Sequence, residues 1–400
     1  MNTKNAIAGI GDTDGRTRWG YVGLLLASGV GASMQIGKVP PSLGALRAEL
    51  HLSIVAAAWV ISLFSVIGAL LGSFAGSVAD LFGPRRAAVA GLVGMGAASL
   101  LGSDASSAPI LLASRVAEGM SFVVMVVAIP SLLVASSCAR DRRFVPALWG
   151  TYMPIGMALS LAIAPAVLRA EGWRALWKLN AAIVLLLAAA LAIARPPALP
   201  ARDRAIPTLA SLRGVLRRGP ALLAVIFAFY TFQYMSVMGF LPTILQQQGF
   251  GPQAAGSLTA VAVIANALGN IVASALIARQ ATPRRLIGFA CIAMMVAALG
   301  IFSAFLAATT RYALVVAFSG IGGLIPASLF ASVPAAAADR SSAATTMGFV
   351  VQASHAGQLI GPPVVAAVAA AAGGWQLSAA ALAPAAAIAF IASLGLRKAR

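Results

Sequence analysis

The chain has 400 residues, of which 60% are hydrophobic and 10% are charged, and its mean hydropathy is +0.93. A soluble globular domain could not bury so much apolar surface, so the composition indicates helices in lipid, and a membrane β-barrel is excluded because alternating ten-residue strands are missing. The net charge of +18 does not indicate nucleic-acid binding, because the cationic residues lie in short loops between apolar runs.

The N-terminal residues 1–18 are polar and glycine-rich, with no apolar stretch followed by a small-residue cleavage site. We therefore expect a cytoplasmic tail, followed by a first helix that acts as an uncleaved anchor.

Apolar runs bounded by charges or by Gly and Pro predict an all-α membrane protein with twelve transmembrane helices. Each run can cross a hydrocarbon core of about 30 Å at about 1.5 Å per residue. The third, ninth and twelfth runs are almost free of polar residues, which predicts that they face lipid and that the others surround a wet cavity. The expected spans are 19–41, 54–80, 87–102, 109–136, 145–168, 175–194, 221–245, 254–278, 286–308, 312–334, 344–371 and 376–396.

The distribution of Lys and Arg predicts the orientation. With the N-terminus inside, 21 of these residues lie in inner loops and 5 in or beside outer loops, while Lys38 and Arg115 remain within spans. This bias predicts cytoplasmic termini and a bacterial-type inner membrane. The five outer residues are Arg47, Arg169, Arg174, Lys178 and Arg311.

The longest inner loop, residues 195–220, begins Arg-Pro-Pro and contains six arginines. It predicts a linker between two six-helix halves, residues 19–194 and 221–400, because proline breaks helices and charge keeps the segment at the surface. Sequence echoes support a duplication: Gly172-Trp173 recurs as Gly374-Trp375, and Pro84-Arg85-Arg86 recurs 199 residues later as Pro283-Arg284-Arg285. Parallel halves of this kind occur in secondary transporters.

Residues 76–86 form a charged hinge between two apolar runs and read G-x-x-x-D-x-x-G-x-R-R. This pattern resembles the signature loop between the second and third helices of the major facilitator superfamily. Arg115 followed by Glu118-Gly119 resembles that family's R-x-x-Q/E-G element, and Gly172-Trp173-Arg174 resembles its frequent G-W-R before the sixth helix. The resemblance covers the whole chain and implies a twelve-helix secondary transporter that works as a monomer.

Two segments, residues 239–242 (Gly-Phe-Leu-Pro) and 357–363, are similar to the cyanate and nitroimidazole permease-like branch of that family. The drug antiporters carry a glycine-rich element with a Gly-Pro pair in the fifth helix. Here the corresponding place reads Ala164-Pro165 without flanking glycines, a departure that disfavours a proton–drug antiporter.

The resemblance implies that the hinge gates the cytoplasmic side. Asp80 would lock the inner gate by charge pairing and by contact with a helix N-terminus, where the helix dipole favours an anion. The alternative is a topology charge beside a tight turn. The gating residues are Gly76, Asp80, Gly83, Arg85 and Arg86.

Charged residues inside the first-half spans are candidates for substrate or proton binding, because a charge in a span is costly unless it is solvated or paired. Glu118 lies three residues after Arg115 on the same helix face, which predicts a local ion pair. That pair is either structural, or Arg115 attracts a substrate anion and modulates a proton on Glu118. Lys38 either extends to the headgroups or lines the outer mouth and attracts anions.

Polar residues at mid-depth in the second half predict a shared substrate site. His355, on the eleventh helix, is expected near the midplane of the membrane and could couple protons to substrate. The alternative is a neutral side chain that is hydrogen-bonded to a neighbouring helix. Interhelical hydrogen bonds are equally the alternative for the others. These are Tyr230, Gln233, Tyr234, Asn266, Asn270 and Gln352.

The sequence contains no nucleotide-binding fingerprint and no metal-ligand spacing, so we expect no cofactor, no metal and no enzyme activity. Cys138 and Cys291 are interpreted as small apolar residues. We expect a proton-coupled transporter of a small organic solute, with an organic anion favoured because Lys38 and Arg115 are the cations within spans. The alternatives are an efflux pump for amphipathic drugs, a transporter-like sensor and a lipid-modifying membrane enzyme.

Overall fold

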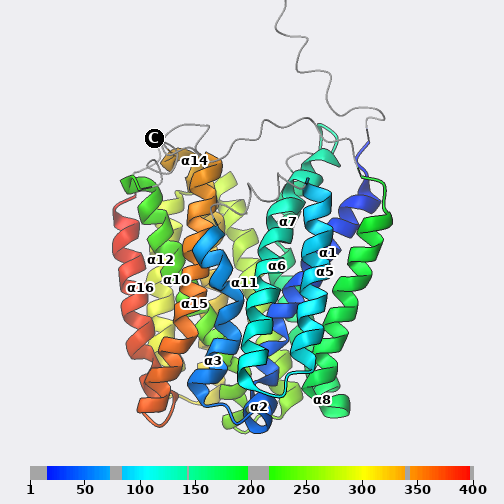
Figure 1. Cartoon of the computed structure of the whole chain (residues 1–400). Helices are drawn as coiled ribbons and strands as arrows, with labels where there is room; N and C mark the ends of the chain where they lie inside the picture. Colours follow the sequence, from blue (N-terminus) through cyan, green and yellow to red (C-terminus); the bar gives the residue numbers. More distant parts are fainter. Residues whose placement is uncertain (1–15, 73–82, 142–143, 197–215, 338–342, 397–400) are drawn as a thin grey trace, which may run out of the picture.

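The computed structural model describes residues 16–72, 83–141, 144–196, 216–337 and 343–396, and every regular element in these ranges is helical. The helices run side by side, and the two ends of the described chain lie at the same end of the bundle (Figure 1). This arrangement confirms the prediction of an all-α membrane protein.

The first half of the chain begins with two helices that together form one span. Lys38 lies between them, and Pro40 and Pro41 occupy the first turn of the second, where proline removes no helical hydrogen bond. The span therefore continues to Glu49, beyond the predicted end at residue 41. The elements are α1 (Trp19–Gly37), α2 (Val39–Glu49), α3 (Ile54–Ser62), η1 (Leu63–Ser65), α5 (Pro84–Ser103), α6 (Ala108–Ala135), α7 (Phe144–Trp149) and α8 (Tyr152–Ile193).

The helix α8 has 42 residues and contains the predicted fifth and sixth spans. Its backbone breaks at Gly172, whose φ of 78° and ψ of −178° lie outside the helical region. Glycine adopts a positive φ without the steric cost that a Cβ brings. The Gly-Trp element thus marks the corner between two membrane passes.

The second half consists of long helices with short connections. The tenth span is divided at Gly323, and the ninth ends at Ile301, seven residues before the predicted end. The elements are α10 (Arg218–Gln247), α11 (Pro252–Ala278), α12 (Pro283–Ile301), α13 (Ala308–Gly322), α14 (Leu324–Ala336), α15 (Ala343–Ala371), η2 (Trp375–Ser378) and α16 (Ala379–Leu394).

Within the described ranges, ten helical segments are long and apolar enough to cross a membrane. Division of α8 at Gly172 adds one pass, and the 29-residue α15, which contains no Asp, Glu, Lys or Arg, adds another. The described helices are therefore consistent with the twelve predicted passes. The predicted linker falls largely on residues 197–215, outside the described ranges, so the domain boundaries stay a prediction.

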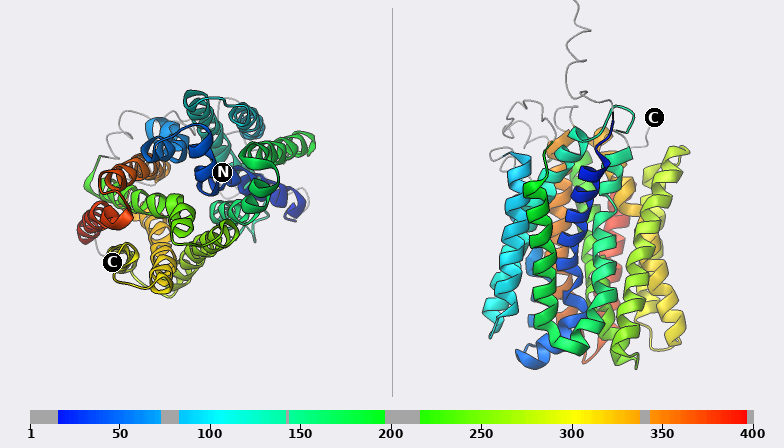
Figure 2. Two further views of the ribbon diagram at one scale, coloured as in Figure 1. Left: turned by 90° about the horizontal axis from the view of Figure 1, so that it is seen from below. Right: turned by 90° about the vertical axis from the view of Figure 1, so that its right-hand side faces the viewer.

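The helices α1–α8 gather on one side of the molecule and α10–α16 on the other (Figure 2, left). Across the boundary, α3 packs against α15, α8 against α11 and α2 against α10. The third, ninth and twelfth passes, α5, α12 and α16, carry large exposed apolar side chains, in agreement with the predicted lipid-facing positions. These include Leu101, Phe289, Val296, Leu299, Ile391 and Leu394.

Candidate functional site

A buried charge cluster lies within the first half. The two carboxylate oxygens of Glu118 are held by different cations: Lys38 Nζ lies 2.7 Å from Oε1, and Arg115 Nη1 pairs with Oε2. All three side chains are fully buried. We call these three residues the charge triad. Its formal charge is +1 when Glu118 is ionised, so the protein interior holds one cation in excess.

Lys38 points into the bundle because it lies at the junction of α1 and α2. Its ammonium donates to Gln35 Oε1 at 2.5 Å and to Ser99 Oγ at 2.7 Å, and it lies 4.5 Å from the centre of the Trp177 ring. The expectation that Lys38 reaches the headgroups or lines an open outer mouth was wrong. The buried carboxylate of Glu118 offers a stronger partner than the interface, and that partner comes from a helix distant in sequence.

The local prediction for Arg115 is confirmed: it pairs with Glu118 at i+3 on α6. Its guanidinium also donates to two backbone carbonyls, Nε to Val60 and Nη1 to Gln35, both at 3.0 Å. Nη2 is buried without a partner among the described atoms. Arg115 therefore has one donor, Nη2, that no described residue occupies.

Two further polar side chains, those of Gln35 and Ser99, connect the triad to neighbouring helices and were not predicted as site residues. Gln35 Nε2 donates to the carbonyl of Asn180 at 3.2 Å, and Ser99 Oγ donates to the carbonyl of Trp177 at 2.9 Å. Gln35 precedes Lys38 by three residues, and this spacing could have indicated the contact between the two side chains.

The second half contains a smaller polar cluster at α10 and α11. Asn266 Nδ2 donates to the Tyr230 hydroxyl at 2.9 Å and to the carbonyl of Ser319 at 2.8 Å. The rings of Tyr230 and Tyr234 stack with centres 5.8 Å apart. Gln233 is buried and donates to the carbonyl of Phe229 at 3.0 Å, and its Oε1 has no partner among the described residues. The structure thus brings together Tyr230, Tyr234 and Asn266.

Asn270 follows Asn266 by one turn of α11 and is partly exposed. Its side chain makes no hydrogen bond to another described residue. Asn270 is therefore separate from the Tyr230–Asn266 pair and remains a predicted substrate residue.

His355 and Gln352 lie elsewhere, along the seam where α15 meets the continuation of α3. Gln352 Nε2 donates to the carbonyls of Ala69 and Leu70 at 2.8 and 3.0 Å. The imidazole of His355 lies so close to Gly68 that a methyl group on that glycine would collide with it. His355 Nδ1 is buried and has no partner in the described part of the chain.

Further along the seam, Ser65 Oγ donates to Gln358 Oε1 at 3.0 Å, and Ser62 Oγ donates to the carbonyl of Gln358 at 3.1 Å. Hydrogen bonds between described residues do not connect the seam, the Tyr230 cluster and the charge triad. The predicted polar residues therefore fall into three groups rather than one set of mutual contacts.

Of the predicted gating residues, Gly76 and Asp80 lie outside the described residues. Gly83 has a φ of 82° and precedes the start of α5 at Pro84. Arg85 donates to the carbonyls of Leu191, Ala192 and Ala194, whereas Arg86 is exposed. Arg85 thereby holds α5 against the C-terminal end of α8, where a cation also interacts favourably with the helix dipole.

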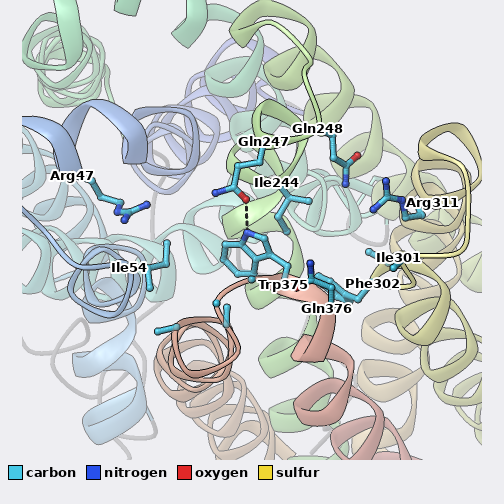
Figure 3. Close-up of a pocket in the computed structure, with 15 residues that line it drawn as sticks. Arg47, Ile54, Ile244, Gln247, Gln248, Ile301, Phe302, Arg311, Trp375 and Gln376 are labelled. Carbon is cyan, nitrogen blue, oxygen red and sulfur yellow. Dashed lines mark hydrogen bonds between the residues drawn. The ribbon is translucent and has the colours of Figure 1, made fainter.

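A pocket of about 650 Å³ opens at the end of the bundle opposite the termini, between α2, α3 and the second half. Figure 3 shows Arg47 and Arg311 on opposite sides of it, with Trp375 between them. Trp375 Nε1 donates to Gln247 Oε1 at 2.8 Å. The described lining contains no acidic residue and none of the predicted substrate residues. The positively charged lining makes this pocket, which lies on the predicted outer side, attractive to anions.

Comparison with known proteins identifies the family. A sequence model described as Major Facilitator Superfamily matches residues 24–362. A lincomycin resistance protein of Streptomyces lincolnensis is 27% identical over 189 residues, which are 47% of this chain and 39% of that protein.

Two solved structures share the fold. A bacterial homologue of the human lysosomal transporter Spinster, in an inward-facing and unoccupied conformation, has a TM-score of 0.78 and 17% identity, and the match covers 96% of this chain and 98% of that one. A D-xylose–proton symporter has a TM-score of 0.73 and 14% identity, with 94% and 96% covered. None of these proteins is a cyanate or nitroimidazole permease, so that narrower resemblance stays a prediction.

Proposed function

The chain belongs to the major facilitator superfamily, and we propose that it carries a small organic anion together with protons. It is a multi-pass membrane transporter and not an enzyme, as membership of this family establishes. The anionic substrate, the proton coupling and the inner-membrane location with cytoplasmic termini are our proposals, the last from the bias of Lys and Arg toward the inner loops.

The observation that carries the proposal is the charge triad, in which Lys38 and Arg115 share one carboxylate, that of Glu118. A buried cation that loses its partner is strongly destabilised. If Glu118 takes up a proton, both cations lose their counterion, and a substrate carboxylate can replace it. The triad then binds H⁺ and an anion together and keeps its formal charge of +1. This balance favours joint transport of proton and anion.

Alternating access supplies the conformational step. In the structure the triad is fully buried, so substrate would reach it after the first-half helices separate from the second half at α3–α15 and α8–α11. The hydroxyl of Tyr230 and the amide of Asn266 face the second-half side of the pathway in this scheme, where they would hydrogen-bond the solute. The arginines of the outer pocket would attract anions toward the entrance.

Efflux of amphipathic drugs is the second candidate, and one observation favours it: the similarity to the lincomycin resistance protein over 189 residues. In that case Glu118 would serve an antiported proton, and Lys38 and Arg115 would be structural partners.

Counterflow in proteoliposomes separates the two functions. Wild type and Lys38→Met are each tested at two pH values with small carboxylates, cyanate-like anions and lipophilic cations. We expect saturable anion exchange that depends on pH and is lost in Lys38→Met. Exchange of lipophilic cations alone, unchanged in that variant, would reject the organic-anion proposal in favour of efflux.

A further inference from the structure

The duplicated Pro-Arg-Arg element has different surroundings in the two halves. In the first half, the guanidinium of Arg85 is occupied by carbonyls at the end of α8. The equivalent residue in the second half is Arg284, since 85 + 199 = 284. Neither Arg284 nor Arg285 takes part in an ion pair or a side-chain hydrogen bond between described residues. The second copy therefore keeps its cationic donors available.

A groove of about 450 Å³ lies beside these arginines, between the start of α12 and the end of α16. Figure 1 places the two helices together at the edge of the bundle. Below Arg284 and Arg285 the walls are apolar, and Phe289, Ile292 and Leu394 are strongly exposed. The groove thus joins a cationic rim to an apolar channel that faces the bilayer.

Among the described residues, no Asp or Glu lines this rim. Neither α12 nor α16 contains Asp or Glu, and from residue 221 onward the sequence has one acidic residue, Asp339. Two arginines at the level of the headgroups attract anionic lipids, and guanidinium groups bind phosphate oxygens with favourable geometry.

Gly288 forms part of the groove floor. A Cβ at this position would lie 3.5 Å from Ser393 Oγ and 3.7 Å from the Phe390 ring, which is ordinary van der Waals contact. A larger side chain would extend into the groove. The absence of a side chain at Gly288 is therefore one reason why the space between α12 and α16 remains open.

We propose that this groove is a binding site for an anionic phospholipid, with the phosphate held by Arg284 and Arg285 and one acyl chain along Phe289, Ile292 and Leu394. In the predicted orientation the site lies in the cytoplasmic leaflet. The inference is independent of the transported substrate. It assigns to the second copy of the Pro-Arg-Arg element a role different from the helix-capping contact made by Arg85.

Native mass spectrometry of the full chain, titrated with phosphatidylglycerol or phosphatidylethanolamine, tests the site. We expect preferential binding of phosphatidylglycerol and about twenty-five-fold weaker binding in Arg284→Gln/Arg285→Gln, since each basic residue near an anionic surface contributes roughly a factor of five. The matched control is Arg86→Gln, the first-half counterpart of Arg285, which should bind as wild type does.

A second pair of variants tests the groove without a change of charge. Gly288→Leu should reduce phosphatidylglycerol binding, whereas Gly288→Ala should preserve it. Equal binding of the two lipids, or full binding by the double Gln variant, would overturn the proposal. Equally tight binding of soluble glycerophosphoglycerol would also overturn it, because the apolar channel would then contribute nothing.

Discussion

Lys38 and Glu118 are 80 residues apart and form a fully buried ion pair, with 2.7 Å between Nζ and Oε1. The second oxygen of the same carboxylate is held by Arg115. Because the carboxylate is shared, the loss of each residue has a different cost. Loss of Lys38 leaves the neutral pair of Arg115 and Glu118, whereas loss of the Glu118 carboxylate leaves two unpaired cations in the interior.

The first prediction concerns stability. We expect Glu118→Gln to lower the free energy of unfolding by roughly 3–5 kcal/mol, the cost of an uncompensated buried charge, and Lys38→Met to lower it by much less. Thermal unfolding of the purified variants in one detergent gives the order. If Lys38→Met were the less stable of the two, the carboxylate would not be the partner that both cations need.

The second prediction concerns pH. Because protonation of Glu118 would release Lys38 and Arg115 for an anion, we expect the initial rate of anion uptake to fall as the external pH rises. Glu118→Gln mimics the protonated side chain, so its counterflow should persist, independent of pH, while uphill accumulation is lost. Glu171→Gln, an exposed acid beyond the triad, is the control and should retain the wild-type profile. If counterflow by Glu118→Gln still depended on pH, the coupled proton would have to bind to another group.

The third prediction concerns the seam between the halves. A methyl group at Gly68 would collide with the imidazole of His355, so Gly68→Ala should reduce the transport rate and the melting temperature. Removal of the imidazole in Gly68→Ala/His355→Ala should restore part of both. Gly44→Ala is the control, because a Cβ there meets no atom within 4 Å. If the double variant were as impaired as the sum of the single ones, the collision would not be the cause.

The parts that could be predicted from the sequence are those with a local signal. The hydrophobic runs located the passes, and the i,i+3 spacing of Arg115 and Glu118 identified their ion pair. The position of Lys38 could not be predicted, because its partner lies on another helix and the choice between headgroup and interior is made by tertiary packing. The mid-depth position of His355 stays a prediction, and its contact with Gly68 could not be predicted because it depends on how α15 meets the continuation of α3.

The fourth prediction concerns the second-half cluster. Asn266 donates to the hydroxyl of Tyr230, and removal of either group leaves a buried polar atom without this partner. We expect Tyr230→Phe and Asn266→Ala each to raise the KM for the transported anion several-fold in proteoliposomes. The double variant should show less than the product of the two effects, because both groups act through one hydrogen bond.

The matched control for this cluster is Tyr312→Phe. Tyr312 also donates a hydrogen bond to a residue of α11, the carbonyl of Leu258 at 2.9 Å, but it lies outside the cluster. It should leave the KM unchanged while lowering stability by about 1 kcal/mol. If the effects of Tyr230→Phe and Asn266→Ala on the KM multiplied, the two residues would act independently rather than through one hydrogen bond. An unchanged KM in both variants would show that the cluster does not bind the substrate.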